Sequence, residues 1–183
     1  MKLFKFEAYK VIISEEALSL KPFKVIWDRD KTKTKMRAIN ELSYVYFMED
    51  PRSDYQYLVD RDERSNAIIE GEGLKDWKPD KLVEDAMAFY STFKTTSALL
   101  LEDTRIAIDK VRSFLRNIDL TEEDDKGKPK YTINTVTSTI KMIPQLIKDL
   151  DEAEKAISSE MQEQSGKVRG QKTKALFEDS LDL

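Results

Sequence analysis

Residues 80–126 contain neither glycine nor proline, and this stretch limits most strongly what the chain can fold into. Apolar and small residues recur along it at steps of three or four, close to the 3.6-residue repeat of a straight α-helix. The stripe consists of Leu82, Ala86, Phe89, Phe93, Thr96, Leu100, Thr104, Ala107, Val111, Phe114 and Ile118. One continuous helix over this stripe would be roughly 55 Å long at 1.5 Å per residue. Such a rod is more typical of a beam or spacer than of a catalyst.

The chain lacks the residues on which much enzyme chemistry depends. It has no His and no Cys, which excludes triads with a histidine base, metal sites with imidazole or thiolate ligands, and disulfides. No glycine-rich phosphate loop occurs, and the acidic run at 122–125 lacks the alternating ligands and central glycine of a calcium-binding loop. We therefore expect a protein that is not an enzyme and that uses no cofactor and no metal.

Composition and charge limit the partners. Hydrophobic residues make up 40% of the chain and charged residues 36%, which is enough apolar material for a core. A net charge of −4 gives no general attraction to nucleic acid, so any such contact must be local. No apolar run reaches the roughly 18 residues that span a membrane. The sequence predicts no membrane partner.

The N-terminus is rich in residues that favour strands. Residues 3–6 and 9–13 are expected to be extended, either paired in a small hairpin or lying on a neighbouring subunit. Ser14, followed by two glutamates, indicates the N-cap of a short helix that ends before Pro22. A second short extended run is expected at Phe23, Val25, Ile26 and Trp27.

Two further helices are expected before the long one. Asp30 is the expected cap of a helix that runs to about Met48, and another helix is expected from Ser53 or Asp54 to Gly71. The aromatic residues of this region are expected to lie in the core, because aromatic side chains dominate buried area. They are Tyr44, Tyr46, Phe47, Tyr55 and Tyr57.

A second apolar stripe follows the polar loop at 119–130. Its members are Ile133, Val136, Ile140, Ile143, Ile147, Leu150, Ala153, Ile157 and Met161. It is expected to return antiparallel to the first rod as an αα-hairpin. Pro144 either kinks this helix or marks its true start, and the threonine-rich stretch at 132–139 would also suit a strand.

The predicted fold is mainly α: a long-helix bundle or αα-hairpin with short N-terminal β segments and an extended C-terminal tail. We expect three parts, namely an N-terminal arm at 1–30, a helical domain at 31–164 and a tail at 165–183.

Two basic clusters are candidates for contact with phosphate or an acidic partner. The first, Lys31, Lys33, Lys35 and Arg37, stands at the expected start of a helix, where cations oppose the helix dipole. The second, Lys167, Arg169, Lys172 and Lys174, lies between small and polar residues. The alternative for the first cluster is a solvated, acid-balanced helix end, which charge runs usually are, and the alternative for the second is a tail that becomes ordered only on a partner.

Aromatic and arginine side chains are the candidates for protein interfaces, because both types are enriched where interfaces are energetically strong. The candidates are Trp27, Arg29, Arg52, Tyr55 and Arg64. An ordinary intrachain ion pair or core contact is the alternative for each. At the C-terminus, Leu176 and Phe177, with Leu181 and Leu183, are candidates for a short amphipathic docking motif.

Three runs carry a resemblance to a known class of proteins. They are Trp27-Asp28-Arg29-Asp30-Lys31, Glu41-Leu42-Ser43-Tyr44-Val45-Tyr46-Phe47-Met48 and Asp50-Pro51-Arg52-Ser53-Asp54-Tyr55. These 19 residues resemble small virion proteins of tailed bacteriophages, most of all the crAss-like phages of gut Bacteroidota. This pattern includes no catalytic motif, so no functional residue is carried over from it.

The resemblance implies a structural protein of the virion, assembled in the cytoplasm of the bacterial host. Its place would be a ring or head–tail connector of the neck or tail. Its partners would be copies of itself in a ring, the portal, other ring or tail proteins, and DNA passing through the channel. Two other hypotheses stay open: a nucleic-acid-associated accessory or internal virion protein that uses the basic clusters, and a carboxylate-based metal-dependent enzyme.

Overall fold

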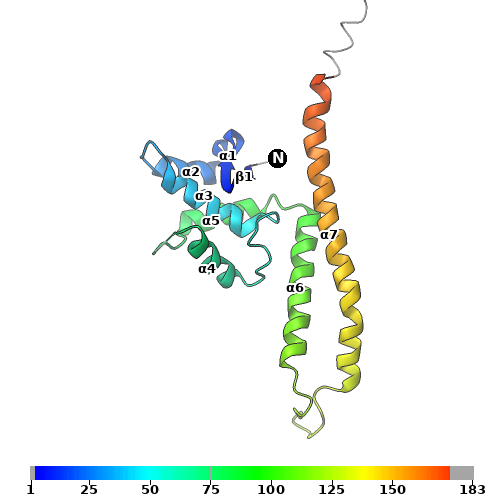
Figure 1. Cartoon of the computed structure of the whole chain (residues 1–183). Helices are drawn as coiled ribbons and strands as arrows, with labels where there is room; N and C mark the ends of the chain where they lie inside the picture. The colour runs from blue at the N-terminus through cyan, green and yellow to red at the C-terminus, as the bar shows by residue number, and fades with distance from the viewer. Residues whose placement is uncertain (1–2, 75, 174–183) are drawn as a thin grey trace, which may run out of the picture. The chain divides into compact units, whose positions relative to one another are not determined.

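The structure, a computed structural model, describes residues 3–74 and 76–173, without the side chains of 161–173. The chain is mainly α-helical with a short N-terminal β-hairpin, as the sequence predicts. It forms two compact units, Met1–Thr95 and Thr96–Leu183 (Figure 1). This division differs from the expected one, because the boundary falls inside the predicted helical domain 31–164, and the predicted arm 1–30 packs within the first unit.

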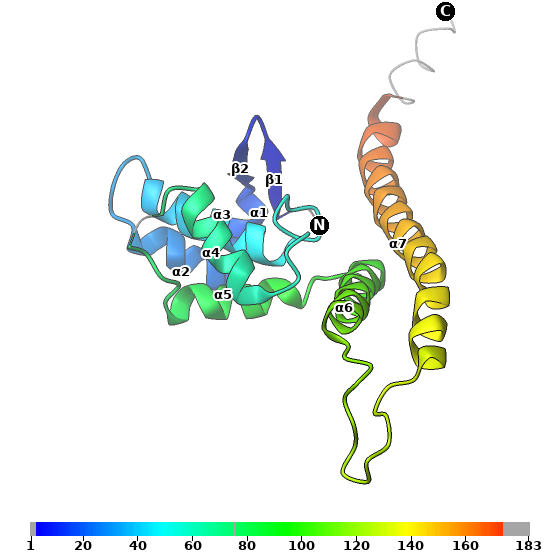
Figure 2. The ribbon, with the colours of Figure 1, turned by 60° about the horizontal axis from the view of Figure 1, so that its bottom comes forward.

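The N-terminal strands pair with each other. β1 (Phe4–Glu7) and β2 (Lys10–Ile13) form an antiparallel hairpin, which Figure 2 shows beside the helices of this unit. Its two-residue turn, Ala8 and Tyr9, has φ angles of 50° and 60°, the left-handed geometry that matches the twist of a hairpin. α1 (Glu15–Ser19) follows, and Ser14 Oγ accepts a hydrogen bond from the Ala17 backbone N–H at 3.1 Å. The predicted cap at Ser14 is confirmed.

The expected extended run at 23–27 is wrong, because these residues belong to α2 (Lys21–Arg29). Pro22 lies in the first turn, where its fixed φ suits a helix and its missing N–H costs nothing. Phe23 and Ile26, three residues apart, are fully buried on one face of α2. The composition of a short apolar run does not distinguish a helix from a strand. In this segment the two buried residues are three positions apart, which is the spacing of one helix face.

The central helices begin later than expected. α3 (Met36–Glu49) starts after Lys35, which has a φ of 53°, and not at Asp30. α4 (Arg61–Gly71) starts after Asp60, whose carboxylate accepts hydrogen bonds from the Asp62 and Glu63 N–H groups. Residues 51–57 form turns instead of the expected first part of that helix.

The core of the first unit joins the hairpin to the helices. Phe4 packs edge-on against Phe23 and stacks on Tyr90, each with ring centroids 5.3 Å apart. Tyr44, Tyr46 and Phe47 of α3 are buried as expected. Tyr55 is partly buried against this core, whereas Tyr57 is 71% exposed and does not belong to it.

The predicted 55 Å rod is two helices. α5 (Lys81–Ser91) ends before Thr92, and α6 (Thr96–Asn117) begins a few residues later. The backbone N–H groups of Thr92, Phe93 and Lys94 bond to the carbonyl three residues back instead of four, which closes the last turn. The Thr92 hydroxyl also donates to the Phe89 carbonyl at 2.7 Å. Side-chain competition of this kind ends a helix without glycine or proline.

The second unit is the predicted αα-hairpin. α6 and α7 (Ile133–Thr173) run antiparallel and side by side, joined by the loop expected at 119–130 (Figure 1). α7 starts before Pro144 and contains it, so Pro144 does not mark the start of the helix and the threonine-rich stretch is not a strand. Because α7 is helical to Thr173, the predicted tail does not begin at 165; residues 174–183 lie outside the described part of the chain.

The inner face of α6 agrees with the expected stripe at Thr104 but differs from it near the helix start, where Leu101 is buried instead of Leu100. Among the described residues of the hairpin, Ala98, Leu101, Thr104, Ala153 and Ile157 are buried, and Leu150 packs against them. Leu100, a member of the predicted stripe, is 56% exposed.

Truncating the two neighbouring leucines of α6 tests this difference. We expect Leu101→Ala to destabilise the hairpin by about 2–4 kcal/mol, because it leaves a cavity in a small core. Leu100→Ala should change the free energy of unfolding by less than about 0.5 kcal/mol. Amide hydrogen exchange of the α6 and α7 peptides measures both. Equal effects would show that the inner face is assigned wrongly.

Candidate interaction surfaces

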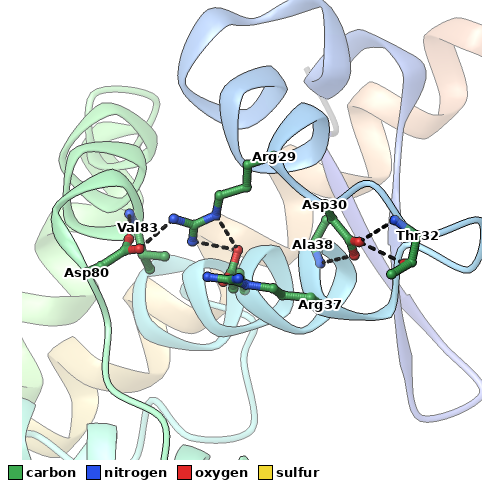
Figure 3. Close-up of polar contacts among 8 residues, drawn as sticks. Arg29, Asp30, Thr32, Arg37, Ala38, Asp80 and Val83 are labelled. Atoms are coloured by element: carbon green, nitrogen blue, oxygen red, sulfur yellow. Dashed lines mark hydrogen bonds and ion pairs between the residues drawn. The ribbon is translucent and has the colours of Figure 1, made fainter.

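Arg29 joins three elements of the first unit. Its guanidinium lies 2.6 Å from Glu41 Oε2 of α3 and 2.5 Å from Asp80 Oδ2, and Asp80 is the N-cap of α5 (Figure 3). Glu41 is only 2% exposed, and its other oxygen accepts from Arg37 Nε at 2.9 Å. Burial by itself would raise the pKa of Asp80, but the hydrogen bond and charge of Arg29 and the hydrogen bonds from the backbone N–H groups of Val83 and Leu82 together lower it. Arg29 therefore holds α2, α3 and α5 together.

Asp30 organises the loop before α3. Its carboxylate accepts from the backbone N–H and hydroxyl of Thr32, and from the Ala38 N–H at 3.1 Å (Figure 3). These hydrogen bonds, led by that of the Thr32 hydroxyl, lower the pKa of Asp30 to about 2. The N-cap position of α3 is occupied by Lys35. Asp30, five residues earlier, nevertheless accepts a hydrogen bond from a backbone N–H group in the first turn of α3, which has no partner within the helix.

The structure separates the four cations of the first basic cluster. Lys35 Nζ donates to the backbone carbonyls of Trp27 and Asp30 and lies 5.6 Å from the centroid of the Trp27 ring. Arg37 pairs with Glu41, as above. Lys31 and Lys33 are exposed. Of the four candidates for a phosphate contact, Lys35 therefore holds the turn before α3, and Arg37 is paired within α3.

Arg52 and Asp50 form a second buried ion pair. Arg52 binds both oxygens of Asp50, which also accepts from the Tyr90 hydroxyl at 2.6 Å. Burial and the charge of Asp50 raise the pKa of Tyr90, and the same two causes raise the pKa of Tyr46 to about 12. The Arg52 guanidinium also lies 5.9 Å from the centroid of the Tyr46 ring. The loop after α3 is thereby joined to α5.

Tyr55 and Arg64 have intrachain contacts as well. Tyr55 packs edge-on against Phe47, with ring centroids 5.2 Å apart, and its hydroxyl donates to Glu72. A Cβ atom at Gly71 would lie 2.3 Å from this hydroxyl, so any other residue at this position would displace the Tyr55 hydroxyl. Arg64, 3% exposed, donates to the carbonyls of Leu58 and Met48. Tyr55 and Arg64 thus make contacts within their own chain, which is the alternative to a protein interface given for both residues.

Sequence reasoning did not single out Glu49, one of the buried carboxylates of the first unit. Glu49 is 1% exposed and contacts Arg61 at 2.6 Å, Ser91 Oγ at 2.7 Å and Lys94 at 3.1 Å. Burial by itself would raise the pKa of Glu49, but these three partners lower it. Glu49 lies two residues before Pro51, which stops the helix. Its position in the sequence therefore predicts the end of a helix but not a buried ion pair.

An open pocket lies next to the Arg37–Glu41 pair. It has a volume of about 410 Å³ and is lined by Arg37, Asn40, Glu41, Gly73, Leu74 and Trp77. Because Arg37 and Glu41 neutralise each other, the pocket offers mainly the apolar surfaces of Leu74 and Trp77.

The α6–α7 hairpin exposes a regularly spaced row of apolar residues on α7. Ile133, Ile140 and Ile147, seven residues apart on α7, are 74%, 52% and 50% exposed. We call these three residues the isoleucine column. The sequence placed all three in the stripe that faces the first rod, but they lie to one side of the contact with α6. This column is the candidate interaction surface.

The remaining candidate residues lie in the C-terminal part of the chain, where the structure describes only the backbone or does not describe the residues. Lys167, Arg169 and Lys172 belong to α7, but their side chains are not described. Lys174, Leu176 and Phe177 lie outside the described residues, as does the docking motif to which the last two were assigned.

Within the described part of the chain, no group of acidic side chains is placed to hold a metal ion. None of the described helices is long and apolar enough to cross a membrane. Comparison with protein-family models, curated proteins and solved structures finds no match.

Glu41 has two arginine partners, and removing Arg29 should lower the free energy of unfolding more than removing Arg37. We expect Arg29→Met to lower the free energy of unfolding by about 3 kcal/mol, because it removes a cation that helps compensate a buried carboxylate. Arg37→Met, at a side chain that is 64% exposed, should cost less than about 1 kcal/mol. Urea titration followed by circular dichroism measures the difference. A larger loss for Arg37→Met would contradict the central place of Arg29.

Asp30 should make stability depend on pH in the acid range. Its pKa is about 2 in the folded chain and about 3.9 when unfolded, so its contribution is complete above pH 4 and is lost as the pH falls through 2. We expect Asp30→Asn to be less stable than the wild type near neutral pH, with the difference shrinking between about pH 4 and pH 2. Asp28→Asn, at an exposed position, is the control. Thermal melts at each pH provide the comparison, and a difference that does not change with pH would refute the role of Asp30.

Proposed function

We propose that this chain is a non-catalytic assembly protein that acts by binding copies of itself and neighbouring structural proteins. The observation that carries this proposal is the isoleucine column, an apolar surface at regular spacing on a helix pair with a small core of its own. A helix face of this kind is stabilised when another helix covers it. Buried ion pairs connect the helices of the first unit, which gives that unit a fixed structure.

We further propose that the assembly is the neck or tail of a tailed-phage virion, where the chain is a ring or connector subunit. The support for this placement is the resemblance carried by the three runs quoted above. Those runs contain Arg29, Glu41, Asp50 and Arg52, the residues of two buried ion-pair networks. The resemblance thus falls on residues that hold the first unit together, as expected for a shared fold.

Quantitative mass spectrometry of purified phage particles tests the placement. We expect the chain in particles, at a copy number equal to the subunits of one portal-associated ring. Its absence from particles would overturn the virion proposal, and a copy number in the range of the major capsid protein would overturn the ring placement.

A matched pair of variants connects the particle result to the proposed surface. Phage carrying Ile140→Asp should incorporate less of the protein than phage carrying Met142→Asp, because both positions are about equally exposed but only Ile140 belongs to the column. Equal incorporation of the two variants would contradict the role of the column in assembly.

A further inference from the structure

One exposed side of α7 carries a stripe of polar residues near the loop at 119–130. Its members follow each other at steps of three or four residues, and each of them is exposed. They are Asn134, Thr137, Lys141, Gln145 and Lys148. We call these residues the donor stripe, because each side chain can donate hydrogen bonds and none is acidic. At 1.5 Å per residue, the donor stripe is about 21 Å long.

Cations of α6 lie level with this stripe. The ion pair Arg105–Glu154 shows which positions of the two antiparallel helices are opposite each other (Figure 1). Moving from this pair towards the loop by equal numbers of residues brings Arg116 close to the level of Lys141. Arg112 lies one turn further from the loop. Both helices therefore contribute cations to the same part of the hairpin.

These cations are largely unpaired. Residues 110–118 and 133–148, which we call the loop half of the hairpin, contain five cations and no acidic residue. Four of the five are exposed and form no ion pair with another described residue. They are Lys110, Arg112, Arg116 and Lys141. The fifth, Lys148, lies 3.6 Å from the exposed Glu152, and exposed pairs of this kind are weak.

The first basic cluster is different in this respect. Lys35 Nζ donates there to two backbone carbonyls, and Arg37 pairs with the buried Glu41. A cation that already has a partner gains less from a phosphate group, because the existing contact must first be broken. The contacts of the side chains therefore favour the loop half of the hairpin over the start of α3 as a surface for phosphate.

Acidic residues limit this surface at both ends. The loop carries the acidic run at 122–125, and Asp149 accepts a hydrogen bond from Gln145 Nε2 at 2.7 Å. Lys141 is about 12 Å from Asp149 along α7. Charges more than about 8 Å apart are largely screened at physiological salt, so these acids do not cancel the centre of the surface.

We infer that the loop half of the hairpin binds the phosphate backbone of a nucleic acid. Lysine and arginine side chains, hydroxyls and amides are the groups that contact phosphate oxygens, and these contacts read no base sequence. The centre of the surface offers three unpaired cations, Arg112, Arg116 and Lys141, with Asn134 and Thr137 beside them on α7.

The composition of the donor stripe favours this partner over other anionic ones. A helix that binds a lipid surface carries Trp, Phe or Leu for insertion, and α7 contains no aromatic residue. The centre of a protein interface is apolar and depleted of charge, whereas the donor stripe contains no apolar residue. Interfaces with nucleic acid are polar and positively charged.

The first test is the binding of the full-length protein to a labelled DNA duplex, followed by fluorescence anisotropy. Three phosphate contacts predict a slope of about −3 for the logarithm of the affinity against the logarithm of the salt concentration. The affinity should therefore fall about 40-fold as the salt concentration rises from about 50 to 200 mM. A wild type that does not bind the duplex at the lowest salt concentration would overturn the inference.

Neutral variants locate the surface. We expect the triple variant Arg112→Gln, Arg116→Gln and Lys141→Gln to weaken binding at least tenfold and to remove most of the salt dependence. Glutamine is a good helix former, so the substitutions remove charge with little effect on the helices. Circular dichroism checks that the helicity is unchanged.

The matched control removes three exposed cations from the first unit, by Lys31→Gln, Lys33→Gln and Lys78→Gln. It should bind the duplex within twofold of the wild type. Equal weakening by the two triple variants would show that only the total charge matters, which contradicts the inference.

A third variant tests the second basic cluster, in which Lys167, Arg169, Lys172 and Lys174 are all replaced by Gln. We expect this variant to keep the greater part of the binding. If it loses the binding while the Arg112, Arg116 and Lys141 variant keeps it, the phosphate contact belongs to the second cluster and the inference is wrong.

Vesicles that contain phosphatidylserine, and polyglutamate as a competitor, test the other anionic partners. We expect no vesicle binding at the salt concentration where the duplex binds, and much weaker competition by polyglutamate than by unlabelled duplex. Vesicle binding without duplex binding would assign the surface to lipid. Competition by polyglutamate as strong as by the duplex would assign it to acidic protein segments. Either result overturns the inference.

This inference goes beyond the proposed function and does not depend on it, because none of its residues belongs to the isoleucine column. The binding results are also independent of the particle measurement. A chain that binds the duplex but is absent from phage particles removes the virion proposal alone. A chain that is present in particles but does not bind removes only this inference.

Discussion

Three buried carboxylates hold the first unit together. Glu41 and Glu49 lie on α3, and Asp50 follows it directly; each is at most 2% exposed. An ionised carboxylate is costly to remove from water unless cations and hydrogen-bond donors compensate it. The compensating groups come from α2, from the segment after α3, from α4 and from the end of α5, so satisfying these charges constrains where each element lies. This is why Arg29 and Arg52, which the sequence left open between an interface and an intrachain ion pair, have contacts in their own chain.

The second unit depends on different physics. Its described core is small and nearly all apolar, and the ion pair between its helices, Arg105–Glu154, is partly exposed. Partly exposed pairs contribute little to stability, so the hairpin relies on a short apolar seam. An exposed apolar column, Ile133, Ile140 and Ile147, lies beside that seam. The first unit is thus held mainly by buried ion pairs and an aromatic core, and the second by a short apolar contact.

Sequence signals predicted the structure correctly where a residue forms its hydrogen bond with a group only a few positions away in the chain. Ser14 caps α1 as expected, because a serine hydroxyl three residues before a free N–H needs no distant partner. The loop at 119–130 and the antiparallel return of α7 also follow from local composition and periodicity. The expected helix start at Asp30 failed because the Asp30 carboxylate reaches Ala38 across a loop, and the loop itself is held by Lys35. No local pattern encodes that closure.

The sequence by itself determined that the chain is mainly helical, that it begins with short strands and that two long helices form a hairpin, because periodicity and capping act within a few residues. Only the tertiary structure decided the rest. The roughly 55 Å rod is broken near Thr92, where Lys94 reaches Glu49, and near the start of α6 Leu101 rather than Leu100 is buried. The break combines the local hydrogen bond from Thr92 to Phe89 with the distant Lys94–Glu49 pair. The buried face of α6 depends on its contact with α7, because a stripe with 3.6-residue spacing is compatible with either side of an apolar helix.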